Sequence, residues 1–122
     1  METTHRAKAH SDRATVVRAH GTMLFSASYD GSVKMWDAAT MELIEHVDKA
    51  HDGQRVTCLA VGPNGLVYTG GDDKLIRRWN RTDLQQYDPL YCHNHSIRTL
   101  NAGKTELLMA GDAGGEVSLW RV

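Results

Sequence analysis

A short cluster of side chains in the last third of the chain has the residue types of a metal site. It reads Cys92-His93-Asn94-His95, and cysteine and histidine are common zinc ligands. The sequence holds no second cluster at ligand spacing, and Cys92 and His93 are adjacent in a segment that we expect to lead from a strand into a loop. We therefore expect neither a metal nor another cofactor, and a metal-dependent hydrolase stands only as an alternative.

Two sets of His, hydroxyl and Asp side chains have the composition of a hydrolytic triad. Such a triad combines a hydroxyl nucleophile, a histidine base and an aspartate that orients the histidine. The sets are His10, Ser26 and Asp30, and His51, Thr69 and Asp73. Because the same set recurs at matching offsets, a structural role is favoured over catalysis, and we expect no catalytic residues and no enzyme.

The elements that position these side chains follow from a repeat in the sequence. Trp36, Trp79 and Trp120 are spaced by 43 and 41 residues, and each ends a similar stretch of sequence. Each stretch contains an apolar run, small residues, a turn dipeptide and then alternating apolar and polar residues, which is typical of a β-hairpin.

Further strands surround each hairpin. An apolar segment precedes every hairpin, and another follows the first two tryptophans after a polar connector. Four strands in a period of about 41–45 residues is the pattern of a propeller blade. The pattern predicts eleven strands and an all-β fold, with the additional strands at residues 14–17, 56–61, 97–100, 41–47 and 84–87.

On these residues the chain resembles the WD-repeat β-propeller family. The first repeat ends in Trp36-Asp37 and contains Ala9-His10 where the family usually has Gly-His. The repeats span residues 9–48, 49–90 and 91–122. The resemblance implies three four-stranded antiparallel propeller blades, the third without its outer strand, which is an incomplete propeller in a single chain.

The resemblance also implies a role for the triad-like residues. In this family a His, a Ser or Thr, an Asp and a Trp form a hydrogen-bonded structural tetrad in each blade. The third repeat has Ala110 and Gly114 at the hydroxyl and Asp positions, so Asp112 is a candidate substitute and this blade should be the least stable. By position the tetrads are His10, Ser26, Asp30 and Trp36; His51, Thr69, Asp73 and Trp79; and His93 and Trp120.

Propellers of this family usually act as scaffolds, binding peptides or protein surfaces on a top face. This face is formed by the loop before the first strand of each blade and the turn between its second and third strands. Several arginines and a tyrosine there favour an acidic or phosphorylated peptide. The predicted contact residues are Arg13, Thr15, Tyr29, Arg55, Thr57, Asp72, Ser96 and Arg98.

Three repeats are fewer than the roughly 4–8 blades of a closed propeller. We predict that residues 1–8 form a strand that completes the third blade of a second chain, giving a six-bladed dimeric ring. Two alternatives stay open: the chain is a fragment of a larger WD-repeat protein, or it is a purely structural subunit of a larger assembly.

Composition indicates which classes of partner and which cellular location to expect. The 122 residues include 14 Lys plus Arg and 15 Asp plus Glu, with a net charge of −1. This balance argues against nucleic acid as a partner, and no apolar stretch has the length of a membrane span. Two cysteines, Cys58 and Cys92, favour a reducing compartment, so we expect a cytoplasmic protein.

Overall fold

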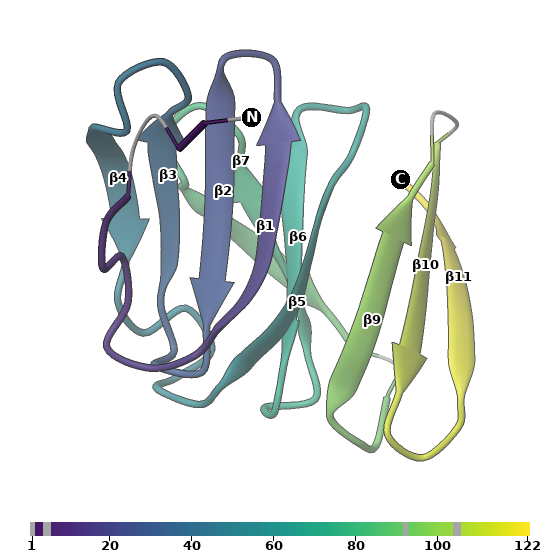
Figure 1. Ribbon diagram of the computed structural model, residues 1–122. Helices are drawn as coiled ribbons and strands as arrows, with labels where there is room; N and C mark the ends of the chain where they lie inside the picture. The colour runs from purple at the N-terminus through teal and green to yellow at the C-terminus, as the bar shows by residue number, and fades with distance from the viewer. Residues whose placement is uncertain (1, 4–5, 92, 104–105) are drawn as a thin grey trace.

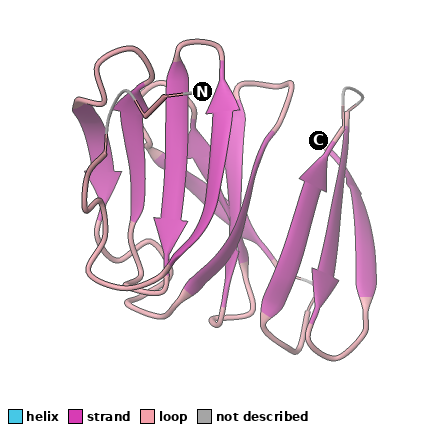
Figure 2. Cartoon of the chain, viewed as in Figure 1, coloured by secondary structure: helices cyan, strands magenta, loops and turns pink. Residues whose placement is uncertain are grey.

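A computed structural model describes residues 2–3, 6–91, 93–103 and 106–122. These residues form eleven β-strands and no helix (Figure 1, Figure 2). In the described part of the chain, no helix is long and apolar enough to cross a membrane. The strands are β1 (Ala14–His20), β2 (Met23–Ser28), β3 (Val33–Asp37), β4 (Leu43–Val47), β5 (Val56–Val61), β6 (Leu66–Gly71), β7 (Ile76–Asn80), β8 (Gln86–Leu90), β9 (Ile97–Ala102), β10 (Leu107–Asp112) and β11 (Val117–Arg121).

The strands form three antiparallel sheets in which neighbours in the chain pair with one another. The orders are β1-β2-β3-β4, β5-β6-β7-β8 and β9-β10-β11, and we call these sheets blade 1, blade 2 and blade 3. They succeed one another along the chain, with blade 2 between the other two (Figure 1). Among the described residues blade 3 has three strands. That the third repeat lacks an outer strand stays a prediction.

The outer strands begin later than the apolar pattern suggested. Met41 and Leu84 have positive φ angles of 60° and 54°, and their amides donate to the carbonyl oxygens of Asp37 and Asn80, each at 2.8 Å. These residues therefore close the turn before the outer strand, which starts at Leu43 in blade 1 and at Gln86 in blade 2.

The core lies between the blades. Between blades 1 and 2, Phe25 and Met35 pack in one cluster with Leu59 and Trp79, all of them almost completely buried. Between blades 2 and 3, Tyr68 and its neighbours pack against Ile97, Leu100 and Leu108 in a second cluster. Burial of apolar surface is the main favourable contribution to folding, so each blade depends on its neighbour for stability.

The free side of blade 3 is apolar and exposed. Met109, Val117 and Leu119 are 48%, 69% and 62% exposed. The residues equivalent to Val117 in the strand register of blades 1 and 2 are Val33 and Ile76, both 0% exposed. Val117 is therefore exposed at a position whose equivalents are buried where another blade follows.

The N-terminal segment forms no strand in the residues that the structure describes there, namely 2–3 and 6–8. Residues 4–5 lie outside the described residues. The segment leads to Ala9, whose carbonyl oxygen accepts a hydrogen bond from Lys34 Nζ at 2.7 Å. The predicted pairing of residues 1–8 with a second chain stays a prediction.

Candidate functional site

In blade 1 the four predicted tetrad side chains are linked by one continuous series of hydrogen bonds. Trp36 Nε1 donates to Ser26 Oγ at 2.9 Å, and Ser26 Oγ lies 2.8 Å from His10 Nε2. His10 Nδ1 lies 3.2 Å from Asp30 Oδ2 and 2.8 Å from Ser32 Oγ. Ser32 is a fifth member that the sequence interpretation missed.

Blade 2 repeats this arrangement with shorter contacts. Trp79 Nε1 donates to Thr69 Oγ1 at 2.8 Å, and the distances from His51 to Thr69 Oγ1 and to Asp73 Oδ1 are both 2.7 Å. Arg77 Nε also donates to Asp73, at 2.9 Å. Arg77 is thus tied to the tetrad, and its side chain is only 10% exposed.

The carboxylates of these tetrads are held in the ionised form. Burial alone would raise the pKa of Asp30, but hydrogen bonds from Ser32 and Ser11 and the nearby His10 lower this pKa to about 2. In blade 2, burial again opposes ionisation, and the hydrogen bonds from His51 and Arg77 bring the pKa of Asp73 below its ordinary value. Ionised carboxylates make stronger hydrogen bonds than neutral ones.

The hydroxyl groups of both tetrads are poorly placed to act as nucleophiles. Ser26 is 5% exposed and Thr69 is 0% exposed, and in each case an indole N–H already donates to the hydroxyl oxygen. A substrate carbonyl must approach that oxygen for acyl transfer. The geometry therefore favours a structural network over a hydrolytic triad.

Blade 3 builds its network from different positions. His93 Nε2 lies 2.7 Å from Ser118 Oγ, to which Trp120 Nε1 donates at 2.8 Å, and His93 Nδ1 lies 2.8 Å from Asp112 Oδ2. Ser118 is the direct cross-strand partner of Ala110, so the hydroxyl has moved to the opposite strand. The sequence interpretation missed Ser118, although a hydroxyl two residues before Trp120 was a visible signal.

The aspartate of blade 3 is displaced for a steric reason. A side chain at Gly114, the usual position, would overlap the ring of His95. Asp112 takes the role from two residues earlier, and its carboxylate also accepts from the amides of Gly114 and Glu116, each at 2.9 Å. The hydrogen bond from His93 lowers the pKa of Asp112 most, and the hydrogen bonds from these two amides lower it further.

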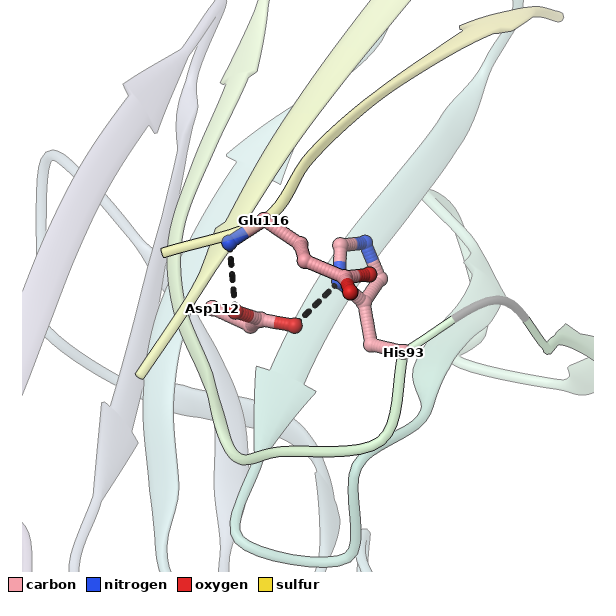
Figure 3. A group of neighbouring side chains, drawn as sticks. All are labelled: His93, Asp112 and Glu116. Atoms are coloured by element: carbon pink, nitrogen blue, oxygen red, sulfur yellow. Dashed lines mark hydrogen bonds and ion pairs between the residues drawn. The ribbon is translucent and has the colours of Figure 1, made fainter. Parts of the chain in front are cut away.

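The same corner of blade 3 brings together three groups that could ligate a metal. One ligand atom each from His93, Asp112 and Glu116 lies within 4.8 Å of the others (Figure 3). Both ring nitrogens of His93 are already hydrogen-bonded, so a metal on this ring would disrupt the network. Cys92 of the considered metal cluster lies outside the described residues, and His95 packs at Gly114.

The predicted top-face residues are connected across the three blades. Arg13 and Arg55 both lie over the ring of Tyr29, with guanidinium carbons 5.5 and 4.8 Å from its centroid. Arg55 Nε donates to Asp72 Oδ2 at 2.7 Å, and Ser96 Oγ donates to Asp72 Oδ1 at 2.6 Å. We call these five residues the top-face row. Burial opposes the ionisation of Asp72, but the contacts with Ser96 and Arg55 lower its pKa.

The remaining three predicted contact residues occupy one equivalent position of the three blades. Thr15 Oγ1 donates to the carbonyl oxygens of Ala27 and Val56, at 3.2 and 2.9 Å, and Thr57 Oγ1 donates to those of Gly70 and Ile97. Both hydroxyls therefore join a blade to the next one. Arg98 holds the equivalent position in blade 3 and is exposed.

Comparison with known proteins agrees with this geometry. Residues 2–37 and 43–80 match the family described as WD40, WD domain, G-beta repeat. The chain is 28% identical over 108 residues to the ribosome biogenesis protein YTM1 of Podospora anserina, covering 80% of the chain and 22% of that protein. It is 37% identical over 82 residues to a p21-activated protein kinase-interacting protein 1-like of Danio rerio, covering 65% and 22%. The chain thus spans less than a quarter of the length of these relatives.

Solved structures show the same fold. The crystal structure of the RRP9 WD40 repeats superimposes with a TM-score of 0.85 at 20% sequence identity, covering 94% of this chain and 37% of that one. The match to the family extends over more than half of the chain, and it includes both complete tetrads. The chain therefore belongs to the WD40 repeat family of β-propeller proteins.

Proposed function

We propose that this chain is a non-catalytic scaffold that binds a protein or peptide partner through the top face of its propeller blades. The observation that carries the proposal is the top-face row, in which Tyr29, Arg55 and Asp72 connect side chains from three blades. A surface fixed in this way loses little side-chain freedom on binding, which favours affinity. The name of the Danio rerio relative describes a protein that interacts with a kinase, which fits such a role.

The partner that we propose is acidic or phosphorylated. Arg13 and Arg55 supply positive charge beside the ring of Tyr29, and Arg98 is exposed on blade 3. Guanidinium groups bind carboxylates and phosphates with two parallel hydrogen bonds. The carboxylate of Asp72 already occupies one side of Arg55. The remaining N–H groups of these arginines face the partner in this proposal, and no nucleic acid or membrane is part of it.

The test is the recovery of partners from an extract of the native cell on the wild-type chain and on Tyr29→Ala. Tyr29→Ala removes the ring between two arginines and should lose the partners that wild type retains. Asp88→Asn, an exposed substitution on β8, is the control and should retain them. Equal recovery on all three chains would exclude the top face as the contact surface.

We further propose that a second copy of the chain completes the ring. Val17 of blade 1 is 55% exposed, whereas the equivalent Leu59 and Leu100 of the other blades are 1% and 8% exposed. Blade 1 thus offers a face that suits the exposed outer face of blade 3. Light scattering should give twice 13.6 kDa for the dimer. A stable monomer would favour a fragment of a longer protein, the principal alternative.

Two further points are proposals as well. If the chain is instead a purely structural subunit, Tyr29→Ala should leave its assembly intact while changes on the blade faces disrupt it.

We propose the cytoplasm as its location, because Cys58 is an unpaired and buried thiol, as is usual in a reducing compartment. A fluorescent fusion in the native cell tests the location.

A further inference from the structure

The first strands of the three blades enclose two adjoining hollows. The larger, of about 520 Å³, is lined by parts of β1, β5 and β9, including Arg18, His20 and Asn101. The smaller, of about 170 Å³, lies between the same strands and includes Thr57, Cys58 and Arg98 in its lining. Both hollows share Arg18, Thr99 and Leu100, so together they form one groove, which we call the inner groove.

The inner groove is positively charged. Its lining residues include Arg18 and Arg98 but no Asp or Glu. His20 also lines the groove, and its Nε2 accepts a hydrogen bond from Arg81 Nη1 at 2.7 Å. Burial raises the pKa of the Cys58 thiol to about 11, while hydrogen bonds with Thr57 and Gly70 and the charges of Arg98 and Arg18 act in the opposite direction. Cys58 and Arg98 line the smaller hollow, and Arg18 lines both hollows.

These two arginines have no carboxylate partner in the described part of the chain. Among the residues that the structure describes, Arg18 donates to the neighbouring carbonyl oxygen of Val17, at 3.1 Å. The acidic group that Arg98 influences is Asp72, and Asp72 already accepts from Arg55 and Ser96. By contrast, Arg13 and Arg55 of the top-face row are stacked on Tyr29.

We propose that the inner groove is an anion-binding subsite, in which Arg98 and Arg18 hold a carboxylate or phosphate side chain of an extended partner peptide. The proposal rests on the scaffold function above. It assigns the main contact with the anionic group to the inner groove and not to the top-face row. Thr99 and Asn101 add a hydroxyl and an amide to the donors that line the groove. Exposed arginines of this kind attract anions most strongly at low ionic strength.

The geometry favours a peptide over a nucleic acid. The groove lies between three strands rather than along an extended basic surface, and the net charge of the chain is −1. Nucleic-acid binding surfaces neutralise several phosphates at once and carry a marked positive charge. Two arginines suit a single carboxylate or phosphate group.

The experiment follows the arginine Nε–Hε signals of the full chain by NMR during titration with sodium phosphate and, separately, sodium acetate at low ionic strength. Saturable shifts of Arg18 and Arg98, with Arg121 unaffected, are the expected result. Tighter binding of phosphate or of acetate then distinguishes a phosphorylated from a carboxylate-bearing partner. Equal, non-saturating shifts of all arginine signals would show general ionic effects and overturn the proposal.

Variants make the test independent of signal assignment. Arg98→Gln and Arg18→Gln should each weaken binding of the anion about tenfold, the effect of losing one charged hydrogen bond. Arg121→Gln removes the same charge outside the groove and should bind as wild type does. Unchanged affinity for phosphate in the double variant Arg18→Gln/Arg98→Gln would overturn the proposal. So would a short single-stranded oligonucleotide that displaces phosphate and binds wild type and every variant with the same affinity.

Failure of the groove and failure of the scaffold function give different results. If Tyr29→Ala loses the cellular partners while Arg18→Gln/Arg98→Gln retains them, the top face binds partners and the inner groove does not. If the chain binds phosphate at Arg18 and Arg98 but recovers no partner in any form, the anion site stands and the scaffold function falls.

Discussion

Blade 3 shows at single residues how a buried hydrogen-bond network can be built in more than one way. Ser26 and Thr69 place the hydroxyl of blades 1 and 2 on the second strand, whereas Ser118 supplies it from the third strand of blade 3. Because Ala110 and Ser118 face each other across the sheet, either position can direct a hydroxyl between His93 and Trp120. The network requires a hydroxyl group at one point in space, and more than one sequence position can supply it there.

This equivalence predicts the behaviour of Ser118→Ala. Loss of the Ser118 hydroxyl leaves His93 Nε2 and the Trp120 indole N–H without their shared partner, which should lower the free energy of unfolding by about 1–2 kcal/mol. Ala110→Ser in the same chain restores a hydroxyl at the usual position and should recover most of the loss. Urea unfolding measures both variants. A double variant no more stable than Ser118→Ala would show that the two positions are not interchangeable.

The ionised tetrad carboxylates predict a loss of stability in acid. The pKa of folded Asp30 is about 2, against an ordinary value of 3.8, so the folded chain favours the ionised form. The stabilisation is complete above about pH 5 and is lost as the pH falls toward 2. Asp30→Asn should make the decline between these pH values shallower, as measured by urea unfolding at each pH. Asp88→Asn, at an exposed residue of β8, is the control and should reproduce the wild-type slope.

These residues also show how far sequence patterns reach. The spacing of Trp36, Trp79 and Trp120 predicts the eleven strands, because apolar alternation and turn residues act locally. The pairing of Arg55 with Asp72 follows the blade's own hairpin, but the stacking of Arg55 on Tyr29 joins two blades. Their relative placement depends on packing between sheets, which no local pattern contains.

At the scale of the element, the turn between the second and third strands of each blade needs a left-handed residue. Gly31 and Gly115 have φ angles of 90° and 88° there, and Lys74 holds the equivalent position in blade 2 with φ 72°. A left-handed conformation costs a residue with a Cβ about 1–2 kcal/mol, and glycine avoids this cost at the expense of some chain entropy.

Lys74→Gly should therefore raise the free energy of unfolding by about 0.5–1 kcal/mol, the difference between these two effects. Gly31→Ala is the converse variant and should destabilise the chain, because its Cβ would also lie 3.2 Å from the carbonyl oxygen of Gln54. Denaturant midpoints compare the two with wild type. A loss of stability in Lys74→Gly would mean that the lysine side chain makes a contact worth more than the strain of its backbone.

At the scale of the whole molecule, the three blades share one packing rule. Blades 2 and 3 each bury the tetrad-bearing face against the blade before them, and the two core clusters repeat this interface. The outer face of blade 3 has the side chains for a further interface of the same kind, with Met109, Val117 and Leu119 exposed. A face of this composition is a site of association, and the internal repeat specifies which of its positions must stay apolar.

That repeat leads to a prediction with a built-in control. Val117 is equivalent to Val33 and Ile76, which are 0% exposed, whereas Leu119 is equivalent to Met35 of blade 1, also 0% exposed, and to the polar Arg78 of blade 2. Val117→Asp should reduce the association of the chain by tenfold or more, because an unpaired charge would be buried. Leu119→Arg should be tolerated, because blade 2 accommodates Arg78, whose Nε donates to the carbonyl oxygen of Asp88 at 2.6 Å. Light scattering across a dilution series measures both. Non-specific attraction between apolar surfaces predicts an equal loss in the two variants, so only unequal losses support a blade-like contact.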